Sequence, residues 1–491
     1  MSNDKHKTIG NFINGEWITG SLKTVANINP ANEQSIGDVV VCTKADVEAA
    51  VAAAKAAFPA WKRTPAPKRG EILFKAAAEM GRRREELARA MTLEEGKTLG
   101  ESMGEIQRAI NNIEYQAAEG RRFGGQTIPS ELPSTFLYTQ REALGVVALI
   151  TPWNFPVAIP IWKLAPALLC GNTVVLKPAS ITPWSAAIIG EIFATAGLPK
   201  GVLNIVFGPG SVVGDTLVTH KDVRAISFTG SNEVGTRLYA LGAQHMKKVQ
   251  CEMGGKNAVI VLDDADLELA ATATVQGAFG ATGQRCTATS RAVVQESVLA
   301  KFTQLVIDKA KLLKVGDGTE AGVNMGPAVD NGQFQTVLDY IKIGKEEGAK
   351  VALGGNRIGD KGFYCEPTVF VDVKRSMRIA QEEIFGPVLA IVSVKDFDEA
   401  IDAANDSPFG LTSSIFTNDV NKVFRYNEHI ETGMTHVNSA TVGGEAQMPF
   451  GGLKATGVGA RECGPTAVDF FSEWKSIYVD YTGQKRTSSI Y

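Results

Sequence analysis

Four short apolar runs decide the fold: GVVALIT at 145–151, NTVVLKP at 172–178, GVLNIVFG at 201–208 and VRAISFTG at 223–230. Segments of helical length and pattern separate them, such as TPWSAAIIGEIFATAG at 182–197. Strands that are apolar on both faces are typical of a parallel sheet covered by helices on both sides. We therefore predict an α/β fold built on a doubly wound parallel sheet.

A second series of the same kind follows Gly255. It begins with NAVIVL at 257–262 and continues with PVLAIVSV at 387–394 and LTSSIFTN at 411–418, interleaved with helical segments. Upstream, residues 44–120 show apolar side chains at three- and four-residue spacing, which predicts amphipathic covering helices. A second α/β domain is the simplest interpretation.

Two β-like segments lie outside both series. STFLYTQREA at 134–143 alternates like an exposed strand, and DFFSEWKSIYVDYTG at 469–483 follows the last domain. We expect them to pair, within the chain or across a subunit boundary, as an oligomerisation element. The predicted division is 1–122 and 144–253 for the first α/β domain, 254–460 for the second, and 123–143 with 461–491 for this element.

Composition narrows the class of protein. The 491 residues are 44% hydrophobic and 21% charged with a formal net charge of -3, so neither nucleic acid nor an anionic membrane is an expected partner. The N-terminus has no apolar core of signal-peptide length, and no run reaches the roughly 18 apolar residues of a membrane span. A cytoplasmic protein with a small-molecule partner is expected.

Cysteine and histidine usage is equally informative. The six cysteines include no CxxC pair and the five histidines no HxxxH pair, which argues against a disulfide framework and against a metal site. One of the cysteines can therefore take part in the reaction of an enzyme.

A candidate phosphate site lies in FTGSNEVG at 228–235, where a strand ends and a helix begins. Gly230 and Ser231 would leave backbone N–H groups free to hold a phosphate at the helix N-terminus. The spacing is GxxxxG without the lysine of a P-loop, and it is not the GxGxxG fingerprint. An ordinary strand-to-helix turn stays an alternative.

Three residues are ambiguous when taken singly. Asn154 follows the strand at 145–151, at the edge where open sheets bind ligands, and either donates to an oxyanion or caps the next helix. Cys286 could be a small buried residue, and Glu252 could be a solvated carboxylate. Together they fit a covalent mechanism in which a thiolate attacks a carbonyl.

The combination of motifs resembles a known family over nearly the whole chain. The segments, in order, are PWNFP at 152–156, KPAS at 177–180, FTGS at 228–231, EMGGK at 252–256, GQRC at 283–286, EEIFGPV at 382–388 and PFGG at 449–452. In this order and spacing they are similar to the aldehyde dehydrogenase superfamily. Within it, GQRCTATSR and the end segment resemble the bacterial 2-oxoglutarate semialdehyde (2,5-dioxopentanoate) dehydrogenases.

The resemblance implies NAD(P)-dependent oxidation of an aldehyde to a carboxylic acid through a thioester. Cys286 would be the nucleophile, and Asn154 with the Cys286 backbone N–H would stabilise the oxyanion. Glu252 would activate the water that hydrolyses the thioester. No metal is required.

The resemblance also implies a set of cofactor-binding residues. Lys177 would contact the adenosine ribose, Ser231 the pyrophosphate, Glu383 the nicotinamide ribose and Phe385 the nicotinamide. Outside this context, Glu383 reads as a surface carboxylate and Phe385 as a core aromatic. The full set is Trp153, Lys177, Ser180, Gly230, Ser231, Glu383 and Phe385.

Ser180 bears on cofactor choice. NAD-preferring relatives often carry a glutamate at this place, and a carboxylate would repel a 2′-phosphate, whereas serine can donate a hydrogen bond to it. We therefore expect NADP to be preferred and NAD to be accepted.

Phe155, Trp162 and Phe450 match the aromatic substrate tunnel of the family, although each could be simple core packing. Arg285 either holds a substrate carboxylate bidentately or pairs with a nearby acid. Succinate semialdehyde enzymes generally carry an arginine where this chain has Trp162, which favours 2-oxoglutarate semialdehyde. Succinate semialdehyde and a broad aldehyde specificity remain alternatives.

Two further classes are compatible with the fold. A catalytically silent relative would keep the glycines but lose Cys286 or Glu252, and both are present. The acylating branch passes its thioester to coenzyme A or phosphate, whereas Glu252 as a water-activating base favours hydrolysis. The exposed β-like segments predict a homodimer or homotetramer.

Overall fold

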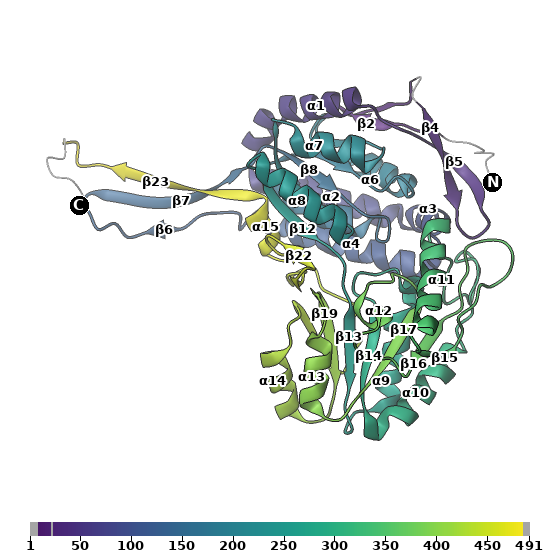
Figure 1. The fold of residues 1–491 in the computed structure, drawn as a ribbon. Helices are drawn as coiled ribbons and strands as arrows, with labels where there is room; N and C mark the ends of the chain where they lie inside the picture. The colour runs from purple at the N-terminus through teal and green to yellow at the C-terminus, as the bar shows by residue number, and fades with distance from the viewer. Residues whose placement is uncertain (1–7, 21–22, 485–491) are drawn as a thin grey trace.

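The computed structural model of the chain describes residues 8–20 and 23–484. Two α/β parts lie one above the other in Figure 1, and a long β arm projects to one side. The first sheet has the order β22-β12-β11-β8-β9-β10-β2-β3. Its strands are β2 (Asn11–Ile13), β3 (Glu16–Ile18), β8 (Val146–Ile150), β9 (Thr173–Lys177), β10 (Leu203–Ile205), β11 (Val223–Thr229), β12 (Lys248–Glu252) and β22 (Gly457–Val458).

The five central strands of this sheet run parallel, and antiparallel strands close its edges. Apolar residues on its two faces belong to two different core clusters. Val147 and Leu149 of β8 pack in one cluster, and Ala148 and Ile150 pack in the other. The doubly wound sheet predicted from the sequence is confirmed.

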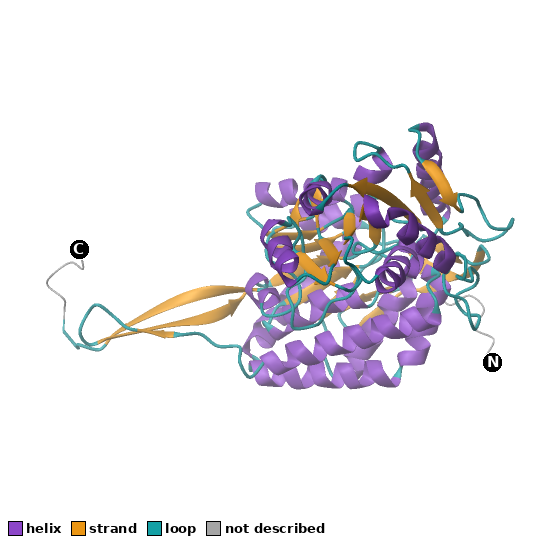
Figure 2. Cartoon of the chain, turned by 90° about the horizontal axis from the view of Figure 1, so that it is seen from below, coloured by secondary structure: helices purple, strands orange, loops and turns teal. Residues whose placement is uncertain are grey.

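Helices cover both faces of the sheet, as Figure 2 shows from below. Capping boxes of Thr43 with Asp46 and of Thr98 with Glu101 begin α1 and α4. The helices are α1 (Lys44–Arg63), α2 (Ala66–Arg82), α3 (Arg84–Glu95), α4 (Leu99–Glu119), α5 (Ala158–Leu169), α6 (Pro183–Thr195), α7 (Asp215–Thr219) and α8 (Asn232–Gln244), with a π-helical turn η1 (Gly210–Gly214).

The second sheet has the order β15-β16-β17-β14-β13-β19-β20 and is parallel except at β15. Its strands are β13 (Asn257–Val261), β14 (Thr289–Gln295), β15 (Lys350–Leu353), β16 (Thr368–Val371), β17 (Val388–Val394), β19 (Thr412–Phe416) and β20 (Met434–Val437). Its helices are α9 (Leu267–Phe279), η2 (Gly280–Gly283), α10 (Glu296–Ala310), α11 (Asn331–Glu346), α12 (Arg378–Gln381), α13 (Phe397–Asn405) and α14 (Val420–His429).

The arm consists of β6 (Thr127–Ile128), β7 (Thr135–Ala143) and β23 (Ser472–Asp480). β23 pairs antiparallel with β7 along its whole length, so the predicted pairing is confirmed and occurs within one chain. The first residues of the predicted tail segment instead belong to a short helix, α15 (Thr466–Phe470). Both figures show the arm extending away from the body of the molecule.

Several elements escaped the sequence analysis. The N-terminal region forms a small sheet of β1 (Thr8–Ile9), β4 (Thr24–Asn29) and β5 (Gln34–Val40), and β18 (Phe409–Gly410) pairs with β21 (Leu453–Lys454). The domain limits stay a prediction. The pairing of β22 with β12 adds one detail, because it joins residues 457–458 to the first sheet. Within the described ranges, no helix is both long and apolar enough to cross a membrane.

Candidate active site

A cavity of about 260 Å³ lies between the two α/β parts, and both contribute to its lining. The loop after β8, the turn after β11, the segment after β12, the loop before β14 and the segment before β17 all reach it. Seven residues predicted from the sequence line this one cavity: Trp153, Asn154, Gly230, Ser231, Cys286, Glu383 and Phe385.

The loop that carries Cys286 has an unusual backbone. Ala281, Thr282 and Gly283 all have positive φ, a conformation that side chains other than glycine rarely adopt. Two bonds hold this loop in place: the Ala281 N–H donates to Glu101 Oε1 at 2.5 Å, and the Thr282 hydroxyl donates to the Gly326 carbonyl at 3.0 Å. The loop thereby presents the half-buried Cys286 to the cavity.

Asn154 is buried and its amide is directed at the same loop. Its Nδ2 donates to the Gln284 carbonyl at 3.0 Å. The alternative that Asn154 caps the next helix is wrong, because α5 begins at Ala158 and its first N–H groups are taken up by Glu105. An amide has two N–H donors, so one stays available for an oxyanion at the nucleophile.

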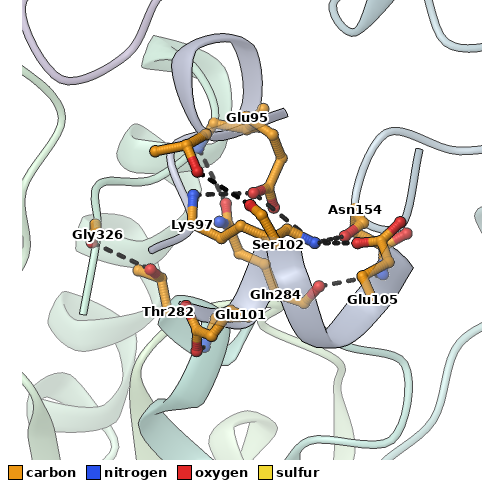
Figure 3. Close-up of polar contacts among 12 residues, drawn as sticks. Glu95, Lys97, Glu101, Ser102, Glu105, Asn154, Thr282, Gln284 and Gly326 are labelled. Atoms are coloured by element: carbon orange, nitrogen blue, oxygen red, sulfur yellow. Dashed lines mark hydrogen bonds and ion pairs between the residues drawn. The ribbon is translucent and has the colours of Figure 1, made fainter. Parts of the chain in front are cut away.

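A buried polar cluster at the start of α4 holds both loops (Figure 3). Lys97 Nζ donates to the Asn154 carbonyl at 2.6 Å and to Glu105 Oε2 at 2.7 Å. Glu105 Oε1 accepts the Val157 N–H at 2.9 Å, and Glu101 binds the nucleophile loop as described above. One helix end therefore fixes the relative position of nucleophile and amide.

Sequence reasoning missed this cluster. Glu101 and Glu105 lie four residues apart, which places them on one face of α4, and Lys97 lies four residues before Glu101, just ahead of the helix. This spacing could have indicated the cluster. It does not distinguish the cluster from an ordinary covering helix, because charged residues on such a helix are usually solvated.

The electrostatic setting favours the neutral thiol. Burial raises the pKa of Cys286 to about 12, and the nearby carboxylates of Glu383 and Glu252 act in the same direction. A proton must therefore leave the sulfur as it attacks, and the site needs a base to receive it.

Glu252 lies at the end of β12, buried at 4% exposure. Burial raises its pKa well above the ordinary value, and the carboxylate of Glu462 raises it further. Glu462 itself is ion-paired with the buried Lys163, a pair that the sequence analysis did not single out. Gly451 lies against Glu252, since an added Cβ there would come within 2.4 Å of Oε1. A carboxyl with a raised pKa is suited to accept protons near neutral pH.

The predicted phosphate turn has the expected geometry. β11 ends at Thr229, and Ser231 is the N-cap of α8, accepting the Val234 N–H at 3.4 Å. Gly235 packs on Met253, whose sulfur would lie 2.4 Å from an added Cβ, so helix and sheet approach closely here. Exposed N–H groups at a helix start fit a pyrophosphate.

Glu383 and Phe385 close the other side of the cavity. Glu383 Oε1 accepts the Gly255 N–H at 2.9 Å, and burial raises its pKa to about 7. Phe385 has a φ of 58° and contacts Trp153 edge-on at 5.4 Å between ring centroids. The Gln333 side chain holds this strained segment by donating to the Phe385 carbonyl. A carboxylate facing an aromatic wall fits a ribose beside a flat heterocycle.

Lys177 ends β9 and Ser180 follows it, and neither lines the 260 Å³ cavity. Burial lowers the pKa of Lys177 to about 8, and its ammonium donates to the Pro178 carbonyl at 3.1 Å. The Ser180 hydroxyl donates its one proton to the Gly208 carbonyl at 3.2 Å, so a hydrogen bond to a 2′-phosphate would replace this contact.

The three predicted aromatic residues lie together near the nucleophile. Trp162 and Phe450 contact each other in a buried cluster, with ring centroids 5.0 Å apart and the rings tilted by 51°. Phe155 and Cys286 pack against the same cluster. This arrangement suits an apolar passage to the thiol.

Arg285 does not join them. Its guanidinium pairs with Glu101 at 3.3 Å, next to Gly280, and it does not line the 260 Å³ cavity. The structure therefore has the arrangement in which Arg285 pairs with a nearby acid. That acid is Glu101, which also accepts the Ala281 N–H of the nucleophile loop.

Comparison with known proteins agrees with this geometry. Residues 17–477 match the aldehyde dehydrogenase family. The chain is 48% identical over 467 residues to a 2,5-dioxopentanoate dehydrogenase of Saccharolobus solfataricus, which covers 94% of this chain and 98% of that protein. It is 46% identical over 481 residues to an alpha-ketoglutaric semialdehyde dehydrogenase of Bacillus subtilis, covering 97% and 99%.

Solved structures extend the similarity to the fold. A betaine aldehyde dehydrogenase from Staphylococcus aureus in complex with NAD+ has a TM-score of 0.94 at 37% identity and covers 97% of this chain and 95% of that chain. An NADP-dependent enzyme of E. coli has a TM-score of 0.94 at 38% identity, covering 96% and 98%. Because sequence and fold agree along nearly the whole length, the protein belongs to the aldehyde dehydrogenase family and is an oxidoreductase that acts on aldehydes.

Proposed function

We propose that this enzyme oxidises an ω-oxo acid, 2-oxoglutarate semialdehyde, to 2-oxoglutarate through a thioester on Cys286. The observation that carries the chemistry is the single cavity shared by Cys286, Asn154 and Glu383. The substrate class is supported by relatives at 48% and 46% identity that are named for this semialdehyde.

Each residue has a defined task. Cys286 adds to the aldehyde carbon as its proton passes to a base, and the second N–H of Asn154 with the Cys286 backbone N–H stabilises the oxygen. The nicotinamide dinucleotide, when bound, accepts the hydride. Glu252 then removes a proton from the water that hydrolyses the thioester, and its raised pKa suits this role.

The residues around the cavity fit a dinucleotide. Gly230 and Ser231 would hold the pyrophosphate, Glu383 the ribose, and Trp153 with Phe385 the nicotinamide. The Glu383 carboxylate has one oxygen bound to Gly255 N–H and another for a hydroxyl group.

We assign NADP as the preferred cofactor, with NAD accepted. Ser180 adds no negative charge and Lys177 supplies a cation beside the expected 2′-position. The E. coli relative described above is NADP-dependent, and the S. aureus relative binds NAD+. The ratio of kcat/KM for the two cofactors tests this assignment.

The arm supports a dimer or tetramer, since a strand pair outside the body exposes large apolar side chains, Trp474 at 50% and Tyr478 at 74%. The same proposal places the enzyme in the cytoplasm, where its six free cysteines stay reduced.

The experiment is a substrate panel without coenzyme A. We expect acid formation, and a kcat/KM for 2-oxoglutarate semialdehyde above those for succinate semialdehyde and for pentanal. Dependence on added coenzyme A would identify an acylating enzyme instead. Equal use of all aldehydes would identify a broad specificity.

A further inference from the structure

Helix α4 carries a third ionic residue towards the site. Glu101, Glu105 and Arg108 follow at spacings of four and three residues, so they share one face of the helix. Glu101 binds the nucleophile loop and Glu105 binds the start of α5 (Figure 3). Arg108 extends the same face by one turn.

Arg108 lies on the aromatic residues of the substrate side. The carbon of its guanidinium is 4.6 Å from the centroid of the Trp162 ring. Trp162 in turn contacts Phe450, in the cluster against which Cys286 packs. A guanidinium on an aromatic face is held in orientation but keeps its edge free for hydrogen bonds.

The donors of Arg108 are incompletely used. Its Nη1 donates to the Gly444 carbonyl, while its Nε is buried without a hydrogen-bond partner. Within the described part of the chain, no carboxylate forms an ion pair with it. Burial lowers the pKa of Arg108, while charge interactions with Cys463, Cys286 and Glu105 act in the opposite direction, which shows that these groups lie close to the guanidinium. An unpaired buried donor of this kind costs free energy unless a ligand satisfies it.

We propose that Arg108 receives the distal carboxylate of the substrate and so determines the preference for an ω-oxo acid. This assignment rests on the proposed function, which supplies the carboxylate. The planar fork of a guanidinium binds a carboxylate through two parallel hydrogen bonds. Arg285, the other arginine near the nucleophile, also has a buried Nε without a hydrogen-bond partner, but its guanidinium is paired with Glu101 at 3.3 Å.

The test measures kcat/KM for 2-oxoglutarate semialdehyde and for pentanal, an uncharged aldehyde of the same chain length, in four variants. In Arg108→Met we expect about a 30- to 100-fold loss for the semialdehyde and less than about a threefold change for pentanal, as for removal of hydrogen bonds to a charged group. Arg108→Lys keeps the positive charge but lacks the planar guanidinium. Its kcat/KM should fall about 10-fold for the semialdehyde and should not fall for pentanal.

Two further variants are controls. Arg285→Met removes the partner of Glu101 at the nucleophile loop and should lower kcat/KM for both substrates by the same factor. Arg121→Met removes an exposed charge just beyond α4 and should leave the ratio of the two substrates unchanged. The product, 2-oxoglutarate, should also bind more weakly to Arg108→Met. Its inhibition constant should rise by about the same factor by which kcat/KM for the semialdehyde falls.

The outcomes separate the two proposals. If the wild type uses pentanal as well as the semialdehyde, the acid substrate is wrong and the role of Arg108 is wrong with it. If the wild type prefers the semialdehyde and Arg108→Met keeps that preference, only the role of Arg108 is overturned. If Arg108→Met loses both activities, Arg108→Lys decides: an equal loss for both substrates there identifies Arg108 as a packing residue of Trp162.

Discussion

Burial and three carboxylates keep Cys286 protonated in the cavity, with a pKa near 12. Thiolate formation is therefore coupled to attack on the aldehyde instead of preceding it. The neighbouring Glu252 has a pKa raised by burial and by Glu462. A carboxylate whose pKa is raised is a stronger base than an ordinary one, which favours proton transfer from water to it near neutral pH.

Replacing the nucleophile tests the covalent step. Cys286→Ala should lower kcat/KM by at least about 10⁴-fold, because the covalent bond is lost while other interactions remain. Affinity for NADP, measured by titration calorimetry, should change less than about threefold. Cys365→Ala, at a buried cysteine away from the cavity, should keep full activity. Retained turnover in Cys286→Ala would refute the mechanism.

The base is tested through pH. Glu252 acts only when deprotonated, so the rate of thioester hydrolysis should rise with pH through its raised pKa, well above 4.5. Glu252→Gln should give one rapid burst of reduced cofactor and then steady turnover slowed by about 10²- to 10⁴-fold, without that pH dependence. The exposed Glu346→Gln is the control. Unchanged steady-state turnover in Glu252→Gln would remove the residue from this role.

The proposed preference for NADP is tested at Ser180. Ser180→Glu places a carboxylate beside the expected 2′-phosphate and should lower kcat/KM for NADP by about 100-fold, while NAD changes only a few-fold. Ser180→Ala should keep both cofactors within a few-fold. NADP use that survives Ser180→Glu would show that the phosphate lies elsewhere.

Among the elements, α4 does most to order the site. Its first two turns carry Glu101 and Glu105, and Lys97 lies just before its N-cap; these three residues bind the loops of Asn154 and Cys286. Burial acts to lower the pKa of Lys97, yet Glu105 and Glu95 raise it overall, so the ammonium stays charged. A buried and fully bonded ion pair fixes one loop geometry because any other leaves a charge unpaired.

The ion pair between Lys97 and Glu105 is tested by a double-mutant cycle. Lys97→Met should cost about 3–5 kcal/mol in the free energy of unfolding, because it leaves Glu105 buried and unpaired. The double variant Lys97→Met/Glu105→Gln should recover part of that loss. Urea unfolding measures the stability and kcat reports on the Asn154 loop.

An exposed pair provides the matched control. Lys200 and Glu16 lie 3.2 Å apart with both side chains largely exposed, and breaking this pair should cost less than about 1 kcal/mol. If Lys97→Met costs no more than Lys200→Met, the buried cluster does not hold the site.

At the scale of the whole molecule, the arm is the part of the chain that exposes large apolar side chains outside the body. β7 and β23 pair along their length outside the body, and Phe136, Trp474 and Tyr478 stay exposed (Figure 1). Apolar side chains on an isolated strand pair are typical of a contact with another subunit.

Sedimentation tests the assembly. The wild type should sediment as a dimer or tetramer at micromolar concentration, and Trp474→Asp with Tyr478→Asp should shift it to a smaller species. Leu312→Asp, at an exposed apolar residue of the second α/β part, should leave the assembly unchanged. A monomeric wild type would contradict the role of the arm.

The sequence by itself determined the fold and the chemistry. Fully apolar runs such as 145–151 admit only a sheet covered on both faces, and strand ends then place Asn154 and the 228–231 turn at one edge. The same sequence supplies a thiol at Cys286, a carboxylate at Glu252 and an amide at Asn154, which are the groups that the proposed reaction uses.

Tertiary structure decided what depends on contacts across long sequence separations. Arg285 has the right charge next to the nucleophile, yet Glu101, 184 residues away, takes up its guanidinium. The sequence analysis did not single out Arg108, which the packed fold places against the Trp162 ring, 4.6 Å from its centroid. Helical spacing defines a face, but only the packed fold defines which face meets the site and which charges find partners there.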